Sequence, residues 1–582
     1  MARAFLLLFA LVLSVPVRAA EQPTTGETIP VADLRPGQTG EVWTVFRGTK
    51  PEPFTVEVTG VIRNALGPGK SLIVCELTDE RVQKMGATAG MSGSPLYIGG
   101  KLAGALSYQI QRFETVRYAG FTPAADLVEV QQRVAPSTSA PVADNTALPI
   151  RANDSFQPLR PVFTISGLSP AVADLFAPQF SALGLGPVAL GGSLQSSSTD
   201  TTAPAVPPVA GDAVSVALTT GDITLAGTGT VSRVDGTHVT AFGHPMLSLG
   251  DVALPMCAAE IVTILPSSMQ SIKLANTGNV IGTISQDRLS AVSGTLGPGP
   301  EMTEVEVNVS NIKGPARSLH FSVARHQQLT PVLVAAGVSQ AILGSNDAGL
   351  SNGFILSSDV TFPAKQTLAT RSLYAGPQGF QQGLGAFVKG LAQDLQNPYE
   401  KTFPHRVVFT VEPLEQNPAI TLDLFQLSRT TAHAGETVEA TISWRDYQGE
   451  AHRQTVGIPI DPAWVGKTLQ VIFAPGDVID DLTGRPQLIS AAQLRSFDAY
   501  LAAQRDSRAE DGLFLTVVEK TRLFTDETVS VPDAPGSIER IAHAADEARF
   551  QHREAVLPLW ERHLLDGKLS DAAIRRSLQV VE

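Results

Sequence analysis

Apolar and polar residues alternate over short stretches in two parts of the chain, and this pattern predicts β-strands rather than helices. Glycine-rich turns, such as Gly67-Pro68-Gly69, separate the stretches. The expected strands cover residues 54–62, 71–77 and 101–108 in the first part, and 222–231, 239–242 and 304–309 in the second. We therefore expect two β-rich segments, at 35–130 and 212–330.

The remainder of the chain alternates between predicted helices, strands and linkers. Helical spacing is expected near 169–183 and near 379–395, and Ser490 with Gln493 forms a capping box that opens a helix through Gln504. The alternation over 436–444 is typical of one strand of a β-sandwich. The expected divisions are a linker with a small α/β element at 131–211, a mixed region at 331–418, a sandwich-like domain with helices at 419–530 and a helical tail at 531–582.

The first twenty residues have the features of a signal peptide. Arg3 supplies a positive charge, residues 5–15 are apolar, and Val17 and Ala19 fit a small-residue cleavage site. A short membrane anchor is the alternative interpretation of this stretch. We expect the mature protein to be periplasmic, held at the cell surface or secreted.

Composition narrows the class of protein. The chain has 582 residues, 43% of them hydrophobic and 17% charged, which predicts several folded domains rather than disorder. The formal net charge of −13 argues against a nucleic-acid partner. Cys75 and Cys257 are the two cysteines, and they form either one disulfide or two buried thiols. Their spacing fits no metal site, so neither a metal nor a cofactor is expected.

A glycine-rich turn at residues 90–95, with the sequence Gly-Met-Ser-Gly-Ser-Pro, contains the first candidate catalytic residues. Gly90 and Gly93 permit a tight turn in which the N–H groups of Gly90, Met91 and Ser92 converge as an oxyanion hole. Ser92 at its apex is the expected nucleophile, and Ser94 is the rival hydroxyl. A plain surface turn is the alternative without chemistry.

A serine nucleophile needs a base and a group that orients the base. His244 follows a predicted strand and lies between Gly243 and Pro245, which indicates a defined turn. We expect His244 to be the base, with His238 as the second candidate. Asp79 ends a predicted strand before Ser92 and is the expected orienting acid. Its alternative role is to cap a short helix at residues 80–85.

The same residues resemble a known family, the sporulation stage IV B (SpoIVB) peptidases, which are chymotrypsin-like serine peptidases. The resemblance runs from Leu77-Thr78-Asp79 through the turn at 90–95 to Gly120-Phe121-Thr122-Pro123. It continues in the block from Gly227 through Ala241-Phe242-Gly243-His244-Pro245 to 271–274 and 292–296. By this resemblance Ser92 corresponds to the nucleophile, His244 to the base and Asp79 to the acid.

The resemblance implies a mainly β fold, with a chymotrypsin-like double β-barrel formed by 35–130 and 212–330. In the family the histidine block precedes the serine block, so this chain is circularly permuted. The implied function is an exported serine endopeptidase acting on a protein or peptide substrate. From the order of the domains alone, we expect the C-terminal domain to bind an envelope partner. An inactive peptidase fold that serves as an envelope scaffold is the alternative. A carbohydrate-binding protein would need exposed aromatic platforms, for which Trp444 and Trp464 are the candidates.

Overall fold

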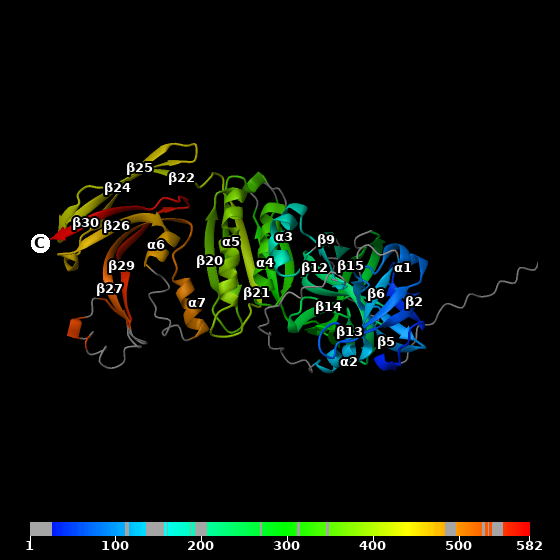
Figure 1. Ribbon diagram of the computed structural model, residues 1–582. Coiled ribbons are helices and arrows are strands. Elements are labelled where there is room, and N and C mark those ends of the chain that lie inside the picture. The colour runs from blue at the N-terminus through cyan, green and yellow to red at the C-terminus, as the bar shows by residue number, and fades with distance from the viewer. Residues whose placement is uncertain are drawn as a thin grey trace, which may run out of the picture.

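The computed structural model describes residues 26–582 apart from 111–115, 135–155, 160, 187, 191, 194–206, 268–270, 311–314, 345–347, 484–495, 526–529, 533–534, 538–539 and 541–550. The fold is mainly β, with 50% strand and 20% helix. Figure 1 shows an elongated chain: two barrels at one end, a sheet covered by helices in the middle and a second β-domain at the other end. The predicted signal peptide lies outside the described residues.

The first barrel contains only strands that are close in sequence. They are β1 (Thr39–Val45), β2 (Pro51–Ile62), β3 (Leu72–Leu77), β4 (Pro95–Ile98), β5 (Lys101–Ile110) and β6 (Tyr118–Pro123). They pair in the order β4-β1-β2-β3-β6-β5, and an additional β4–β5 pairing closes the ring. Phe54, Val56 and Val58 on β2 point into its core because alternate residues of a strand face the same side.

The second barrel repeats this plan. Its strands are β11 (Ala213–Gly221), β12 (Thr224–Asp235), β13 (His238–Ala241), β14 (Gly250–Leu265), β15 (Ile272–Arg288) and β16 (Ala291–Leu296). They pair in the order β11-β14-β15-β16-β13-β12, and a β11–β12 pairing closes the ring. The two closed barrels confirm the expected β-rich, chymotrypsin-like double-barrel fold.

The segment between the barrels attaches to both of them. Helix α2 (Ala124–Gln132) follows the first barrel directly, and β7 (Phe156–Pro158) pairs with the edge of β5. Strands β8 (Val162–Ser166) and β9 (Val188–Leu190) extend the sheet of the second barrel beyond β12, and the short β10 (Gly192–Ser193) pairs with β15. The predicted helix near 169–183 is α3 (Pro170–Ala182).

The middle of the molecule continues the sheet of the second barrel. Strand β18 (Arg317–Ala324) pairs with β11, and beyond it lie β17 (Met302–Val309), β21 (Arg406–Pro413), β19 (Phe354–Thr361) and β20 (Leu368–Tyr374). Helices α4 (Leu329–Ser339) and α5 (Gly376–Leu395) lie next to this sheet (Figure 1). The predicted domain boundary at residue 330 therefore differs from the structure, because β17 pairs with β21 across it.

The C-terminal domain is a β-sandwich with helices, as expected. One sheet holds β22 (Ile420–Leu427), β24 (Thr437–Asp446) and β25 (Ala451–Pro459). The other holds β23 (Thr431–His433), β26 (Thr468–Pro475), β27 (Gly512–Thr525), β28 (Ser530–Pro532), β29 (Gln551–Asp566) and β30 (Ile574–Val581). Both contribute to one apolar core, and α6 (Gly476–Thr483) and α7 (Phe497–Arg505) connect β26 to β27.

Two predictions for this domain, the helical tail and the capping box at Ser490, are not borne out by the described residues. The predicted helical tail at 531–582 is wrong for residues 551–582, because β29 and β30 are strands. In β30, Leu578 and Val580 are buried and alternate with exposed residues. The predicted capping box at Ser490 lies outside the described residues, and the described helix α7 begins after Ser496, whose hydroxyl accepts from the Ala499 N–H.

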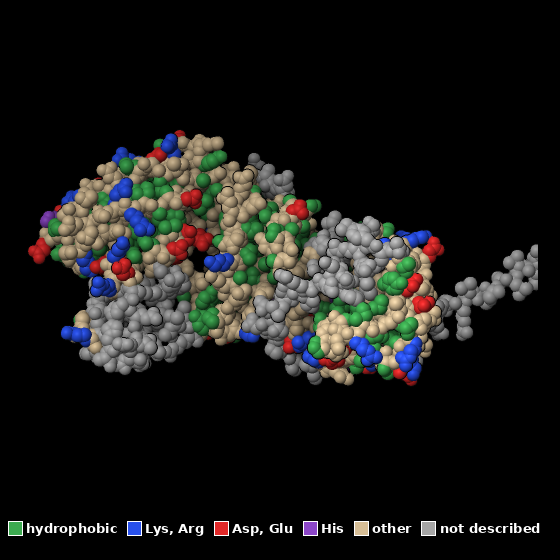
Figure 2. Space-filling view, in the orientation of Figure 1, with side chains coloured by type: hydrophobic (Ala, Val, Ile, Leu, Met, Phe, Trp, Pro, Cys, Tyr) green, Lys and Arg blue, Asp and Glu red, His purple; other side chains and the backbone are tan. Residues whose placement is uncertain are grey.

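Figure 2 shows acidic and basic side chains interspersed on the visible face of both the barrel end and the C-terminal end. Between them, the face formed by the middle sheet and its helices carries few charges. Among the described residues, no helix is long and apolar enough to cross a membrane.

Candidate active site

The serine turn lies between the two barrels. Gly90 and Gly93 have φ values of +96° and +94°, a region that glycine adopts without strain. A Cβ at Gly93 would lie 2.0 Å from the Thr230 carbonyl oxygen and 2.4 Å from the Phe242 nitrogen. The Ser92 carbonyl accepts from the Thr230 N–H at 2.8 Å. The turn of the first barrel is therefore docked directly on strand β12 of the second.

The histidine turn, at residues 242–245, also contacts strand β12 at Thr230. Phe242 and Gly243 have φ values of +71° and +66°, so the chain reverses sharply after β13. The Phe242 N–H donates to the Thr230 carbonyl at 3.2 Å. The Gly243 carbonyl accepts from the Thr122 hydroxyl of the first barrel at 2.6 Å. Thr230 thus contacts both turns, and the structure brings the Ser92 and His244 segments together.

Ser92 and His244 are both buried, with exposed fractions of 0% and 1%. Within the described part of the chain, neither Ser92 Oγ nor His244 Nε2 has a hydrogen-bond partner. Buried polar groups are normally paired, so two unpaired ones in one location need an explanation. Ser94, the rival hydroxyl, instead donates to the Met91 carbonyl at 2.6 Å. Of the two serines, Ser92 is the one whose hydroxyl has no partner.

The local contacts of His244 suit a proton acceptor. Nδ1 lies 2.7 Å from the Pro245 carbonyl oxygen, which can only accept, so Nδ1 carries the hydrogen and Nε2 keeps its lone pair. Burial lowers the pKa of His244 to about 4, so the imidazole is neutral at neutral pH. The backbone of Pro245, and after it that of Leu159, interacts with the ring and opposes this lowering of the pKa.

Two of the three expected oxyanion donors are available. The Met91 N–H donates to the Thr88 carbonyl at 2.9 Å and is therefore not free, which corrects the prediction for that residue. The N–H groups of Gly90 and Ser92 make no hydrogen bond to any described residue. They are the donors that can stabilise an oxyanion beside Ser92.

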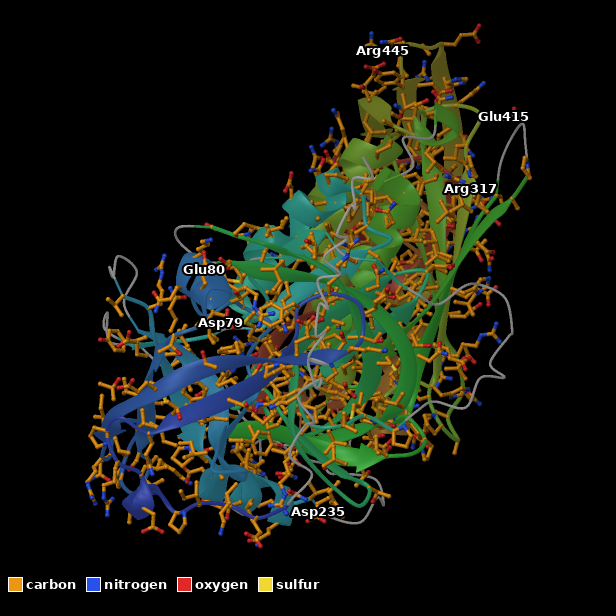
Figure 3. All side chains as sticks on the ribbon, turned by 90° about the vertical axis from the view of Figure 1, so that its right-hand side faces the viewer. Asp79, Glu80, Asp235, Arg317, Glu415 and Arg445 are labelled. Carbon is orange, nitrogen blue, oxygen red and sulfur yellow. The ribbon has the colours of Figure 1, made fainter. Side chains whose placement is uncertain are left out.

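Asp79 does not orient His244 in this structure. It is the N-cap of α1 (Glu80–Met85), and its carboxylate accepts from the Arg81 N–H at 2.8 Å. The Arg81 guanidinium also lies 3.0 Å from Asp79 Oδ2, and hydrogen bonding to Arg81 lowers the pKa of the carboxyl group. Figure 3 shows Asp79 next to Glu80 at the start of this helix. The capping role that the sequence left open is the role observed, and His238 lies half-buried on β13.

Asp287 holds the loop after His244, a role that sequence reasoning missed. Its buried carboxylate accepts from the N–H groups of Met246 at 2.7 Å, Leu247 at 2.8 Å and Leu249 at 3.1 Å. Burial raises the pKa of Asp287, and these backbone hydrogen bonds oppose the rise. Asp287 lies on β15, so only the strand pairing of the folded barrel brings it to this loop.

Lys273 is a second buried charged residue that sequence reasoning missed, although its segment belongs to the family-like block. Its side chain has an exposed fraction of 0%, and Nζ donates to the Thr44 hydroxyl at 2.7 Å. Its stem lies against Gly90, where a Cβ would be 2.9 Å from the Lys273 Cβ. Burial lowers the pKa of this amine to about 7. Lys273 therefore links the second barrel to the serine turn and to β1.

The cysteines are not bonded to each other. Cys75 lies in the core of the first barrel and Cys257 in a small cluster of the second, and both are free thiols. The possible disulfide is thus wrong, and the alternative of two buried thiols is correct. Burial raises the pKa of each to about 12, which makes both unreactive in the folded state.

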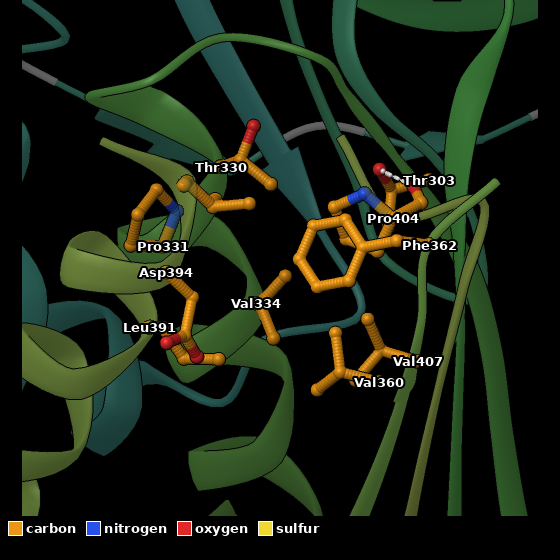
Figure 4. A pocket seen from close by; sticks show the side chains of 11 residues that line it. Thr303, Thr330, Pro331, Val334, Val360, Phe362, Leu391, Asp394, Pro404 and Val407 are labelled. Carbon is orange, nitrogen blue, oxygen red and sulfur yellow. Dashed lines mark hydrogen bonds between the residues drawn. The ribbon is translucent and has the colours of Figure 1, made fainter. Parts of the chain in front are cut away.

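Two other places, a group of possible metal ligands and a small cavity, contain fewer groups that could take part in catalysis. Asp511, His563 and Asp566 are close enough to share a cation, but Asp511 pairs with Arg371 at 3.0 Å. A small cavity under α4 and α5 is lined mostly by apolar side chains (Figure 4). Burial raises the pKa of Asp394 in its wall to about 6. The remaining residues that line it are Thr303, Thr330, Pro331, Val334, Val360, Phe362, Leu391, Leu395, Pro404 and Val407.

The comparisons with known proteins bear on the first barrel. Residues 15–121 match the model of the SpoIVB peptidase S55 family, and this range includes Asp79 and the serine turn. No curated protein and no solved structure matches the chain. The expected resemblance is confirmed for the matched range, while the permuted order of the histidine block is not tested by it. Residues 15–121 are thus similar to the SpoIVB peptidases, a family of serine peptidases.

Proposed function

We propose that the protein is an exported serine endopeptidase in which Ser92 is the nucleophile and His244 the general base. The observation that supports this most is the meeting of the two turns at Thr230. It places an unpaired buried hydroxyl and an unpaired imidazole nitrogen in the same interface between two closed barrels. Apo geometry in which the two groups are not yet hydrogen-bonded is common, because such bonds tighten when substrate binds.

The steps follow from the groups at this interface. Ser92 Oγ attacks the carbonyl carbon of the substrate while its proton moves to His244 Nε2. The negative oxygen of the tetrahedral intermediate accepts from the N–H groups of Gly90 and Ser92. The imidazolium then protonates the leaving amine, and the C–N bond breaks. Water hydrolyses the acyl-enzyme by the reverse sequence of proton transfers.

The orienting group in this proposal is a backbone carbonyl rather than a carboxylate. The Pro245 oxygen accepts from Nδ1–H, which fixes the tautomer, but it carries no full charge to stabilise the imidazolium. Asp287 supports the arrangement indirectly by fixing the loop that follows. We therefore expect a slower peptidase than one with a complete Ser-His-Asp triad.

Export and partner binding remain proposals that rest on other features. The signal-like segment at 1–20 supports a periplasmic, surface-held or secreted protein. The C-terminal sandwich carries an open groove of about 500 Å³, and we place the binding of an envelope partner there. Polar and apolar atoms both line this groove, and its residues are Gln426, Leu427, Thr430, Thr431, Thr468, Arg576, Ser577 and Gln579.

Labelling with a small fluorophosphonate probe tests the assignment of the nucleophile. We expect the wild type and Ser94→Ala to become labelled and Ser92→Ala and His244→Ala to stay unlabelled. Ser94→Ala is the matched control, because its hydroxyl lies in the same turn and is already hydrogen-bonded. Labelling of Ser92→Ala at the wild-type rate would contradict the proposal. The scaffold alternative, which the full burial of both groups favours, predicts a folded protein that never labels.

A further inference from the structure

Strand β7 is an added edge strand on the first barrel. It runs antiparallel to the end of β5, with Pro158 opposite Tyr108 and Gln157 opposite Gln109. The pairing continues one residue further, because the Leu159 N–H donates to the Ser107 carbonyl at 2.9 Å. A short segment from outside the barrel therefore pairs with β5 through its backbone, which is how extended peptides bind to an open sheet edge.

The C-terminal end of this added strand lies at the candidate active site. Ser107, which accepts from Leu159, lies beside the histidine turn: a Cβ at Gly243 would be 3.3 Å from the Ser107 Cβ. The Leu159 backbone also interacts with the His244 ring. Residues before Leu159 lead away from this point along β5. The added strand thus ends at Leu159, next to the histidine turn.

The side chain of Leu159 is enclosed by the first barrel. Its exposed fraction is 0%, and it belongs to the same apolar cluster as Met91, the neighbour of Ser92. The cluster also includes Val42, Ala103 and Leu106, which are all apolar. The Leu159 side chain therefore lies in the apolar core of the first barrel, a setting that accepts an aliphatic side chain and disfavours a charged one, since an unpaired buried charge is costly.

We infer that residues 156–159 occupy in cis, along the edge of β5 and in the pocket around Leu159, the place of an extended peptide substrate, and that this pocket accepts leucine-like residues. This inference rests on the proposed function and adds a substrate class to it. The substrate is an extended peptide whose residue before the cleaved bond is a medium-sized aliphatic one. Such a peptide competes with the protein's own segment for the same backbone partners.

Two probes and two variants test the inference. The first probe is the small fluorophosphonate, which needs an active Ser92 but no pocket. The second is a peptidyl diphenyl phosphonate with the sequence Phe-Gln-Pro-Leu, compared with the same peptide ending in aspartate. The variants are Leu159→Asp, which displaces the segment, and Leu159→Ala, which only shortens the side chain. Circular dichroism and protection of the buried Cys75 and Cys257 thiols verify folding.

We expect the fluorophosphonate to label Leu159→Asp at least about tenfold faster than the wild type, with Leu159→Ala in between, because each substitution weakens occupancy of the pocket. In the variants, the leucine phosphonate should react at least about tenfold faster than the aspartate one. If Leu159→Asp does not fold, the comparison of Leu159→Ala with the wild type decides.

The outcomes separate the two proposals. Equal fluorophosphonate rates in the wild type and both variants would overturn occupancy in cis. Equal rates with the leucine and aspartate phosphonates would overturn the pocket assignment, while labelling of Ser92 would still support the peptidase. If no folded form reacts with any probe, the proposed function itself fails.

Discussion

Replacing Lys273 with methionine should stabilise the protein at neutral pH, and the gain should disappear in alkali. Among the described residues, no carboxylate pairs with this buried amine, whose one hydrogen bond is to the Thr44 hydroxyl. A fall of its pKa from 10.5 to about 7 corresponds to roughly 5 kcal/mol at 1.36 kcal/mol per pH unit. Methionine has a similar length and avoids this cost, but it leaves the Thr44 hydroxyl unpaired, which costs about 1–3 kcal/mol.

The direction in which the free energy of unfolding changes with pH follows from proton binding. Between the folded pKa of about 7 and the unfolded value of 10.5, the unfolded chain holds the proton that the folded chain has lost. Wild-type stability therefore rises with pH in this window by about 1.4 kcal/mol per pH unit, and the variant lacks this rise. At pH 7 and below, the variant should be more stable by about 2–4 kcal/mol. Near pH 10 it should be the less stable of the two proteins.

The chain provides its own reporter for this measurement. The free thiols of Cys75 and Cys257 are buried in the first and second barrels respectively, so a brief pulse of thiol reagent in urea measures unfolding of each barrel. Lys101→Met is the matched control, because the Lys101 side chain is 51% exposed and should give a difference that does not change with pH. A Lys273→Met difference that is the same at both ends of the pH window would refute the reasoning.

Three further substitutions have clear expected results. Asp79→Ala removes only a helix cap, so fluorophosphonate labelling should stay within about twofold of wild type and the free energy of unfolding should fall by about 1 kcal/mol. A large loss of labelling would restore Asp79 as the orienting acid. Gly93→Ala should abolish labelling and expose the Thr230 amide to hydrogen exchange, since the new Cβ would lie 2.0 Å from the Thr230 oxygen. Asp287→Asn should slow labelling at least about tenfold and increase exchange at residues 246–249, and unchanged exchange there would contradict its positioning role.

Local pattern was enough to predict most of the strands that form the barrels. Residues 54–62, 71–77 and 101–108 alternate or run apolar over the right lengths, and β2, β3 and β5 cover nearly the same ranges. The C-terminal strands were missed for a physical reason. Strand β30 exposes Arg575, Arg576, Ser577 and Gln579 and buries only Leu578 and Val580, and over a few turns such a mixture also fits a helix.

The candidate site was partly predictable, because only some of its members carry a local signal. The serine and histidine turns contain glycines whose positive φ values the folded chain uses. Asp287 and Lys273 carry no such signal, since the pairing of β15 with other strands brings them to the site. Asp79 was assigned by resemblance, but its neighbour Arg81 provides a stronger local partner.

The closure of each barrel on its own strands has a consequence for the order of events during synthesis. The first barrel is complete once residue 123 has been made, so the serine turn can form early, whereas its docking partners Thr230 and Gly243 do not yet exist. His244 follows Ser92 by 244 − 92 = 152 residues. At about 5–20 residues per second, this is a delay of roughly 8–30 seconds. Under the proposed function, a newly made chain therefore carries its nucleophile without its base for that time.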